Sequence, residues 1–269
     1  MEAGMMSLRI LSCNIRRNMP EDEESGNGWD ARRDLCAEII RAQRADVVCL
    51  QESVNPQWKD LSNRLPGFSS FGLANPDKVF NPTNAILFER ARFEMESAGG
   101  FWLSETPHVA GTKSWDSARP RFVNWVCLMD RDTGVEFRVW NGHLDHIGQI
   151  AREKQAQLIM EASEVFPDLP QLLTGDFNAD AANPAIEVVK AGGWLDTHAV
   201  NGPGDPGFTF HAFLGPRFAE EPKERIKGKI DWIFCRGAAK ALAAEIIRDG
   251  RDERYPSDHY FVSAEVTLG

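Results

Sequence analysis

Short runs of apolar residues recur along the whole chain and predict its strands. Several of these runs are apolar on both faces of an extended chain, as strands buried between two layers are. They cover residues 8–13, 46–51, 85–88, 124–129, 135–141, 171–174, 230–235 and 261–266. We therefore expect a layered protein whose strands lie in its interior.

Three other segments repeat their apolar residues at helical spacing. Residues 29–44 and 150–165 each place apolar side chains on one stripe of a helix. The third segment is marked at both ends, because Asn183-Pro184 supplies a cap residue and a proline at the first helical position, and Gly192-Gly193 ends it. Helices that alternate with strands along the chain indicate an α/β protein.

No feature of the sequence marks a boundary between domains. The chain has no repeat of fixed period, no low-complexity segment and no Ser/Gly-rich linker. We therefore expect one domain over residues 1–269, with residues 1–6 disordered. Residues 18–28, with four consecutive acids, and residues 201–229, rich in Gly, Pro and charge, predict surface loops. Long loops of the second kind are often functional.

The composition excludes several classes of protein. A chain of 269 residues with 42% hydrophobic and 26% charged residues is globular rather than disordered or collagen-like. Its formal net charge of −10 argues against a broad basic surface for duplex nucleic acid. Since no apolar stretch reaches the roughly 18 residues of a membrane helix, we expect no membrane span. Five cysteines without a CxxC pair predict buried free thiols and a reducing, cytoplasmic compartment.

Polar and ionisable residues recur where the apolar strands end, which is where α/β folds place their chemistry. These residues are Asn14, Glu52, His143, Asp145, Asp176, Asn178, Asp231, Asp258 and His259. The spacing of two between His143 and Asp145, and again between Asp176 and Asn178, puts each pair on one face of an extended chain. The pattern therefore favours one functional site built from several strand ends.

Each of these residues also has a structural interpretation. A carboxylate after a strand is more often a helix cap or a turn residue than a catalyst, and Asn178 is typical of a turn. Asp231 differs because it lies inside an apolar run, where a carboxylate is costly to bury unless it is paired or bound to a metal. The recurrence of such residues in chain order favours the functional interpretation for the set.

Six short motifs follow one another along the chain and together resemble a known family. They are Ser12-Cys13-Asn14, Leu50-Gln51-Glu52, Asn141-Gly142-His143-Leu144-Asp145, Gly175-Asp176-Phe177-Asn178, Ile230-Asp231-Trp232 and Ser257-Asp258-His259. This order is similar to that of the endonuclease/exonuclease/phosphatase superfamily of metal-dependent phosphoesterases, and residues 101–107 and 113–116 further resemble a bacterial branch of metal-dependent hydrolases. The pattern departs from the family at Gly142, where a threonine is usual.

The resemblance implies a fold and a metal site. The fold is a four-layer α/β sandwich, in which two mixed β-sheets pack face to face with helices on the outside. Glu52 would hold a divalent ion, Mg²⁺ or alternatively Mn²⁺, and Asn14 and Asp258 would complete its coordination. Mg²⁺ suits such a site because it prefers hard oxygen ligands and keeps several waters.

The resemblance also implies catalytic roles. Asp176 would orient and deprotonate the attacking water, and Asn178 would donate its amide to the phosphate. His259 would bind a nonbridging oxygen while Asp231 holds its imidazole in the cationic form. His143 would contact the phosphate or the leaving group. Its neighbour Asp145 is a further catalytic candidate, and Glu105 is a candidate acidic partner of His143.

Candidate substrate-binding residues lie between the motifs. Arg119 and Arg121 suit a phosphate because the planar guanidinium donates two hydrogen bonds at once. Trp115, together with the phenylalanines at 208, 210 and 213, offers rings for stacking, although aromatic residues spaced by two are also typical of a strand core. The basic residues of 223–229 fit a solvated surface equally well.

These observations predict a monomeric Mg²⁺-dependent phosphoesterase that hydrolyses a phosphodiester or a phosphomonoester. The net negative charge favours small or single-stranded substrates over duplex DNA. Two alternatives stay open: a DNA-repair type endonuclease or exonuclease, and a catalytically silent binding or scaffold protein of the same fold. The sequence leaves the identity of the substrate open.

Overall fold

The computed structural model describes residues 5–73, 84–166, 169–202, 204, 206–222 and 228–269. Its twelve strands form two six-stranded mixed sheets. The first sheet has the order β11 (Ala239–Ile247), β12 (Phe261–Leu268), β1 (Met6–Asn14), β2 (Val47–Gln51), β4 (Ile86–Glu89), β3 (Phe68–Phe71). The second has the order β5 (Phe93–Trp102), β6 (Phe122–Asp130), β7 (Glu136–His143), β8 (Gln171–Asp176), β10 (Asp231–Arg236), β9 (Leu195–Asp196).

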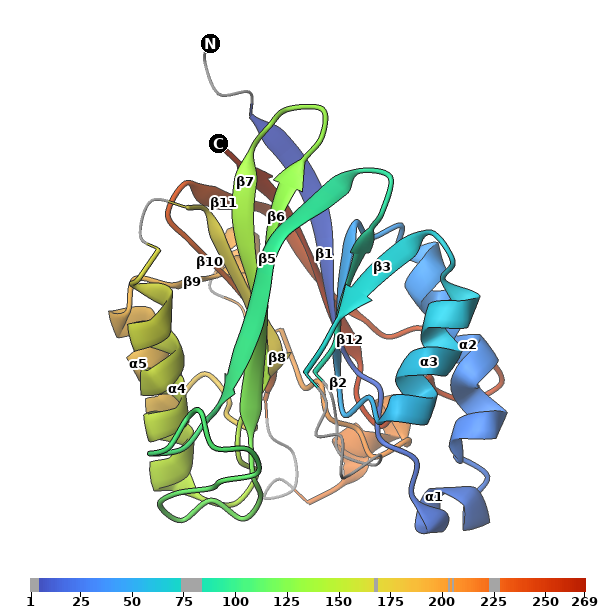
Figure 1. Ribbon diagram of the computed structural model, residues 1–269. Coiled ribbons are helices and arrows are strands. Elements are labelled where there is room, and N and C mark those ends of the chain that lie inside the picture. Colours follow the sequence, from blue (N-terminus) through green and yellow to red (C-terminus); the bar gives the residue numbers. More distant parts are fainter. Residues whose placement is uncertain (1–4, 74–83, 167–168, 203, 205, 223–227) are drawn as a thin grey trace.

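The two sheets pack face to face and helices cover their outer faces (Figure 1). Helices α2 (Trp29–Ala42) and α3 (Asn55–Arg64) cover the first sheet, and α4 (Gln149–Ser163) and α5 (Pro184–Ala191) cover the second. Shorter elements are α1 (Pro20–Glu24) and the 3₁₀ turns η1 (Thr197–Asn201) and η2 (Gly215–Glu220). The four-layer α/β sandwich implied by the resemblance is confirmed.

The alternation of side chains along β1 explains why its sequence is apolar on both faces. Leu8 and Ile10 lie in the core between the two sheets, whereas Leu11 and Cys13 lie in the core beneath α2. Successive side chains of a strand point to opposite faces, so a strand between a sheet and a helix layer needs apolar residues at nearly every position. The same argument holds for the central strands of the second sheet.

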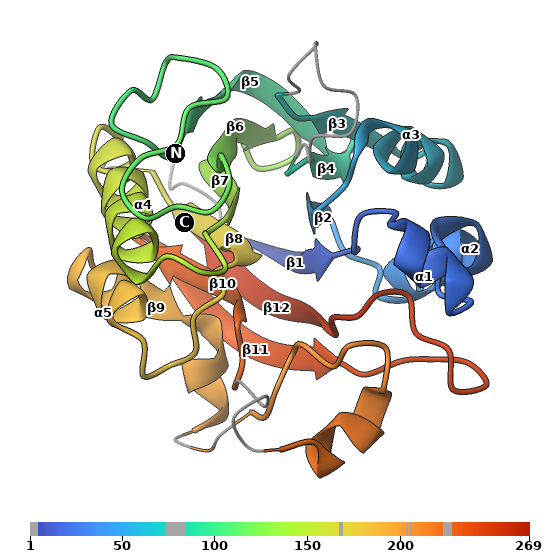
Figure 2. The ribbon, with the colours of Figure 1, turned by 90° about the horizontal axis from the view of Figure 1, so that it is seen from below.

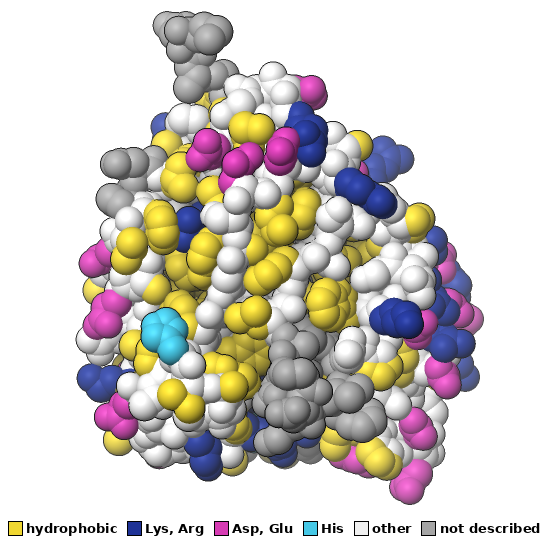
Figure 3. Space-filling view, viewed as in Figure 1, with side chains coloured by type: hydrophobic (Ala, Val, Ile, Leu, Met, Phe, Trp, Pro, Cys, Tyr) yellow, Lys and Arg dark blue, Asp and Glu magenta, His cyan; other side chains and the backbone are white. Residues whose placement is uncertain are grey.

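All eight predicted strands and all three predicted helices are present. The strands that the sequence did not reveal are β3, β5, β9 and β11, and the missed helices are α1 and α3. β5 and β11 are edge strands with many exposed positions, so their sequences lack a buried apolar run. Apolar side chains gather on the face of the molecule that carries β5 (Figure 3).

The N-terminus and the first predicted loop correct two expectations. Met6 is buried and begins β1, where it pairs with Leu268, so the disorder expected for residues 1–6 does not include residue 6. Residues 1–4 lie outside the described residues. The acidic stretch 18–28 contains the single-turn helix α1, whose start is favoured by Pro20 at its first position.

The composition predicted buried free thiols, and this prediction is confirmed. All five cysteines are free and buried. Within the described ranges, none of the helices is both long enough and apolar enough to cross a bilayer.

Candidate active site

The register of the strands brings the predicted residues to one edge of the sandwich. In the second sheet, Asp176 at the end of β8 pairs with His143 at the end of β7 and with Asp231 at the start of β10. In the first sheet, Asn14 ends β1 opposite Gln51 on β2, and Glu52 follows directly. Figure 2 views the molecule from the side on which β1 and β2 end. Strand ends of both sheets therefore meet there, as the sequence predicted.

Several residues after these strands have left-handed backbone conformations that are uncommon outside glycine. The φ angles are 51° at Arg16, 59° at Glu52 and 49° at Asn178. Such conformations cost about 1 kcal/mol or more and persist where the surrounding structure enforces them, often at functional sites. Each of these turns aims a polar side chain at the same cavity.

The cavity at this edge has a volume of about 570 Å³ and is lined by acids, bases and aromatic rings. Its polar lining includes Arg16, Arg17, Glu52, Arg119, Arg121, His143, His146, Asp176, Asn178, Asp258 and His259. Its aromatic lining consists of Trp102, Phe122 and Phe210. A pocket of this size, with convergent polar groups on an apolar wall, is typical of a small-molecule site.

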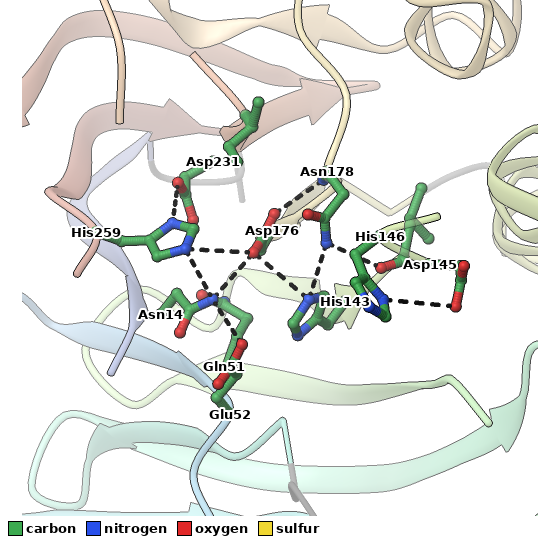
Figure 4. Close-up of polar contacts among 12 residues, drawn as sticks. Asn14, Gln51, Glu52, His143, Asp145, His146, Asp176, Asn178, Asp231 and His259 are labelled. Carbon is green, nitrogen blue, oxygen red and sulfur yellow. Dashed lines mark hydrogen bonds and ion pairs between the residues drawn. The ribbon is translucent and has the colours of Figure 1, made fainter. Parts of the chain in front are cut away.

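His259 and Asp231 form a buried ion pair at one side of the cavity (Figure 4). His259 Nδ1 lies 2.8 Å from Asp231 Oδ2. Burial lowers the pKa of His259, but the charge and the hydrogen bond of Asp231 outweigh it and raise this pKa to about 10. The imidazole is therefore cationic at neutral pH, with its Nε2–H directed toward Asp176 Oδ2 at 3.8 Å.

Asp176 lies at the centre of the polar network (Figure 4). Its Oδ2 accepts a hydrogen bond of 2.9 Å from Asn14 Nδ2, and its Oδ1 accepts one of 2.8 Å from the Asn178 backbone N–H. Burial and the charge of Asp231 raise the pKa of Asp176 to about 7, against the opposing effects of His259 and the two hydrogen bonds. A carboxyl group with such a pKa can exchange a proton near neutral pH.

His143 is a buried and neutral histidine on the other side of Asp176. Its Nε2 lies 3.0 Å from Asn178 Nδ2 and 3.4 Å from Asp176 Oδ2. Burial, followed by the charge of Arg121, holds the pKa of His143 well below its usual range. Among the described residues its Nδ1 has no hydrogen-bond partner. The expected pairing with Glu105 is not formed, because Glu105 is exposed on a surface loop and does not line the cavity.

Two of the predicted metal ligands, Glu52 and Asp258, line the same cavity. Glu52 Oε2 accepts the Arg17 backbone N–H at 3.1 Å, and its Oε1 lies 3.5 Å from Asn14 Nδ2. Asp258 is buried, and Arg16 Nε lies 3.7 Å from its Oδ2. Burial raises the pKa of Asp258, and Glu52 adds to this effect by its own negative charge. Two carboxylates that repel each other across a polar cavity fit a hard divalent cation such as Mg²⁺.

Two features refine the choice of ligands. Asn14 Oδ1 accepts the Arg16 backbone N–H at 3.0 Å, so the amide turns its nitrogen rather than its oxygen toward Glu52 and Asp176. Ligand atoms of Asp176, Asp231 and His259 also lie within 4.8 Å of one another. A cationic imidazole repels a metal ion, so Glu52 and Asp258 are the better first ligands.

Asp145 is placed differently from the other predicted catalytic residues. β7 ends at His143, so Asp145 lies beyond the strand and the two side chains do not share the face of one strand. Asp145 is fully buried and does not line the cavity. Its carboxylate accepts hydrogen bonds from backbone N–H groups, which include Ala118 at 3.1 Å and Gly148 at 2.8 Å. This corrects the expectation that Asp145 faces the reacting groups.

The structure brings only part of the predicted substrate site to the cavity. Arg119 and Arg121 line it, whereas Trp115 does not. Lys229 is buried with its Nζ 2.7 Å from Asp196 Oδ1, and residues 223–227 lie outside the described residues. Lining residues that the sequence did not single out include Arg16, Arg17, Trp102, Phe122 and His146. Arg16 and Arg17 lie two and three residues after the end of β1, so a search for polar residues near strand ends could have found them.

The comparisons with known proteins agree with this geometry. The sequence pattern of the endonuclease/exonuclease/phosphatase family matches residues 11–259. A family protein from Bacteroides thetaiotaomicron is 30% identical, with a TM-score of 0.87 and coverage of 99% of both chains. A second protein from that organism, named a mannosyl-6-phosphatase, is 30% identical with a TM-score of 0.84, over 96% of this chain and 99% of its own. The human Nocturnin catalytic domain, at 17% identity and a TM-score of 0.74, shares the fold over 100% of this chain and 97% of its own.

Proposed function

The chain belongs to the endonuclease/exonuclease/phosphatase family, and we propose that it is a divalent-metal-dependent phosphoesterase in which Asp176 activates the attacking water. The observation that carries the proposal is the set of buried groups around Asp176. A carboxyl group with a pKa of about 7 lies between the cationic His259 and the neutral His143 in one cavity. Groups whose environments drive their pKa values apart are typical of acid–base sites.

A phosphate ester resists hydrolysis because its negative oxygens repel a nucleophile. A catalyst therefore needs positive charge near those oxygens, a base for water and assistance for the leaving oxygen. When bound, Mg²⁺ or Mn²⁺ would supply charge neutralisation at the phosphate and the leaving oxygen. Glu52 and Asp258 would hold the ion, and Asn14 would complete the site through a hydrogen bond to the carboxylates or to a metal-bound water.

Asp176 is the proposed general base. Its carboxylate ionises near neutral pH and lies between hydrogen-bond donors that fix its orientation, Asn14 Nδ2 and the Asn178 N–H. A base whose pKa lies close to the working pH transfers protons efficiently. Asp176 would accept a proton from the water that attacks phosphorus, and the P–O bond to the leaving group would break.

His259 and Asn178 are the proposed donors to the phosphate. His259 is cationic, and its Nε2–H points into the cavity because Nδ1 is held by Asp231. Asn178 Nδ2 contacts His143 Nε2 at 3.0 Å and the Leu144 carbonyl at 3.2 Å, so a phosphate oxygen would take the place of His143 as acceptor. Preoriented donors of this kind stabilise the charge that develops in the transition state.

The substrate is proposed to be a compact phosphate ester rather than a long duplex. The cavity of about 570 Å³ has room for a small ester, and Trp102 and Phe122 offer it a ring surface, with their ring centroids 5.1 Å apart. The net charge of −10 disfavours broad contact with duplex DNA. The relative named a mannosyl-6-phosphatase supports a phosphomonoester of sugar size.

The proposal is tested by turnover of a panel of phosphate esters. The panel contains bis(p-nitrophenyl) phosphate, p-nitrophenyl phosphate, hexose phosphates and mononucleotides, each assayed with Mg²⁺, with Mn²⁺ and with excess EDTA. We expect hydrolysis of at least one ester that needs the metal and is lost in Glu52→Gln. Glu187→Gln is the control, because Glu187 is exposed on α5 and pairs with Lys190 on the same helix, away from the cavity lining. Turnover that survives EDTA, or no turnover of any ester, would contradict the proposal.

A further inference from the structure

Asp145 holds together two segments at the edge of the cavity. Its Oδ2 accepts hydrogen bonds from Ser117 Oγ at 3.2 Å, Ala118 N at 3.1 Å and Arg119 N at 3.2 Å. Its Oδ1 accepts hydrogen bonds from the N–H groups of Ile147 at 3.0 Å and Gly148 at 2.8 Å, ahead of α4. The carboxylate therefore joins the segment 117–119 to the turn between β7 and α4.

These contacts leave the carboxylate no role in proton transfer. Burial opposes ionisation of Asp145, but the N–H groups of Gly148, Ile147 and Ala118, aided by Arg121, lower its pKa to about 2. Both oxygens are saturated with donors, and the side chain is 0% exposed. A permanent anion shielded from the cavity can act on substrate only through the groups that it positions.

Arg121 is the group that depends on Asp145. The segment 117–119 leads directly to Arg121, whose Nε lies 3.8 Å from Asp145 Oδ2 and whose Nη2 lies 3.2 Å from His146 Nδ1. Only 11% of the Arg121 side chain is exposed, and it lines the cavity. Its Nε has no hydrogen-bond partner among the described residues. The guanidinium is held on one side by Asp145 and His146 while the residue lines the cavity, where its positive charge is suited to bind an anion.

The charge of Arg121 acts on the reacting groups. It lowers the pKa of Glu52 and of His143, and the carboxylates of Asp145, Glu52 and Asp176 in turn oppose the effect of burial on Arg121 itself. The guanidinium therefore lies near the place where a phosphate would bind between Asp176 and Glu52. To bind that phosphate, the Arg121 side chain has to be held in one orientation, because an arginine side chain otherwise has large rotamer freedom.

A second set of contacts fixes the same segment against α4. Asp116 Oδ1 accepts the Ala151 N–H at 2.7 Å in the first turn of the helix. Gln155 Oε1 accepts the Asp145 N–H at 2.9 Å, and Gln155 Nε2 donates to Ser117 Oγ at 3.3 Å. A Cβ at Gly148 would lie 2.6 Å from the Asp116 carbonyl oxygen, so the segment and the turn approach closely. The segment that leads to Arg121 is thus held against α4 by several hydrogen bonds.

We propose that Asp145 is a positioning residue, which holds the segment 117–121 so that the Arg121 guanidinium faces the phosphate of the substrate. The proposal rests on the proposed function, since it names the group that binds the phosphate at the same site. It also distinguishes Asp145 from Asp176: the former never exchanges a proton, and the latter does.

The experiment is a double-mutant cycle on phosphate binding. Asp145→Asn, Arg121→Gln and the double variant are titrated with inorganic phosphate in Mg²⁺ buffer by calorimetry, and kcat and KM are measured on the best ester of the panel. We expect Arg121→Gln to weaken phosphate binding about 10- to 100-fold, the loss of one charged hydrogen-bonding partner. Asp145→Asn should weaken it about tenfold in the wild-type background and less than about twofold in the Arg121→Gln background.

A matched control separates positioning from loss of stability. Asp130 is 2% exposed, accepts backbone N–H groups at the far end of β6 and pairs with Arg92 Nε at 2.8 Å, so Asp130→Asn removes a similar buried charge away from the cavity. We expect both variants to melt at lower temperature, but only Asp145→Asn to lose phosphate affinity. Equal losses of phosphate affinity in Asp145→Asn with and without Arg121 would overturn the proposal.

Two outcomes keep this test independent of the proposed function. If wild type binds phosphate but hydrolyses no ester, the proposed function fails and the cycle still tests Asp145. If wild type hydrolyses an ester and Arg121→Gln binds phosphate unchanged, the positioning proposal fails alone. Should Asp145→Asn not fold, Arg121→Ala replaces it. With Asp145 intact, added millimolar guanidinium should restore phosphate affinity in Arg121→Ala, and no restoration would count against the proposal.

Discussion

Removal of the charge on Asp231 should convert His259 from a cation into a neutral imidazole. In Asp231→Asn an amide oxygen can still accept the Nδ1–H, so the position of the ring is kept while the anion is lost. In wild type the pKa of His259 stands at about 10 against an ordinary value of 6.5. That interval corresponds to about 5 kcal/mol in favour of the cation, at about 1.4 kcal/mol for each pKa unit.

The direction of the effect follows from burial. Without Asp231, burial lowers the pKa of His259 and only the charges of Asp176 and Asp258 still raise it, so we expect the ring to be neutral at pH values where the wild-type ring is charged. We expect kcat to fall about 100- to 10,000-fold near pH 8, because the site loses its cationic donor to the phosphate. As the pH falls toward about 6, the neutral ring of the variant begins to regain its proton, and the ratio of wild-type to variant rates should narrow.

The assay is the pH dependence of kcat for both proteins on the same ester, with far-ultraviolet circular dichroism as the check on folding. A control variant, Asp130→Asn, removes a buried and paired carboxylate at the other end of β6 and should leave the pH profile unchanged. Activity of Asp231→Asn within about tenfold of wild type near pH 8 would refute the reasoning. If the ratio of wild-type to variant kcat is the same near pH 8 and near pH 6, the proposed role of the positive charge on His259 is refuted.

Three further predictions concern other parts of the site and its support. Asn178→Asp keeps a residue that tolerates φ of 49° but replaces the amide donor with an acid, so kcat should fall about 100- to 1,000-fold in the ester assay. His211 is buried with a pKa lowered to about 3 by burial, so its neutral form must charge when the protein unfolds in acid. The free energy of unfolding should therefore fall between about pH 6.5 and pH 3, and urea titrations should show a shallower pH slope in His211→Phe. Gly142→Ala should raise the free energy of unfolding by about 0.4–1 kcal/mol, since the nearest side-chain atoms would lie 3.6 Å from the added Cβ. Gly175→Ala should lower the free energy of unfolding, because Gly175 has a φ of 155° and the carbonyl oxygen of Gly142 would clash with the added Cβ.

The strand ends were predictable because burial on both faces leaves a clear signal. Asn14, Glu52, Asp176 and Asp231 follow or begin apolar runs that can only be interior strands, and the register places them as expected. A polar residue next to such a run has to be solvated, paired or functional. The sequence therefore identified the centre of the site without knowledge of the contacts.

The role of Asp145 could not be read from its spacing. Two residues share a face only while the strand continues, and β7 ends at His143. The strand was predicted to end at residue 141 and ends at His143, so Asp145 lies beyond it and the alternation of strand side chains does not fix its direction. Of the five donors that surround Asp145, three lie 26 to 28 residues before it in the sequence and two lie two and three residues after it, a long-range arrangement that no local pattern encodes.

The walls of the cavity were predicted least well. Trp102 ends β5, an edge strand with the half-exposed pair Gly99-Gly100 and no buried apolar run. Trp115 and Glu105 lie on the loop between β5 and β6, whose course is set by contacts such as Ser114 Oγ with the Glu105 N–H at 2.9 Å. Loop side chains carry no periodic signal, so their direction depends on the fold as a whole.

The most direct test of the central claim is the rate at which Asp176→Asn hydrolyses the ester that wild type turns over with Mg²⁺. The amide keeps the shape of the carboxyl group and loses its basicity, while His259, His143 and Asn14 remain in place. The account predicts a rate at least about 1,000-fold below wild type, with an unchanged circular dichroism spectrum. A folded Asp176→Asn variant within about tenfold of the wild-type rate would contradict it.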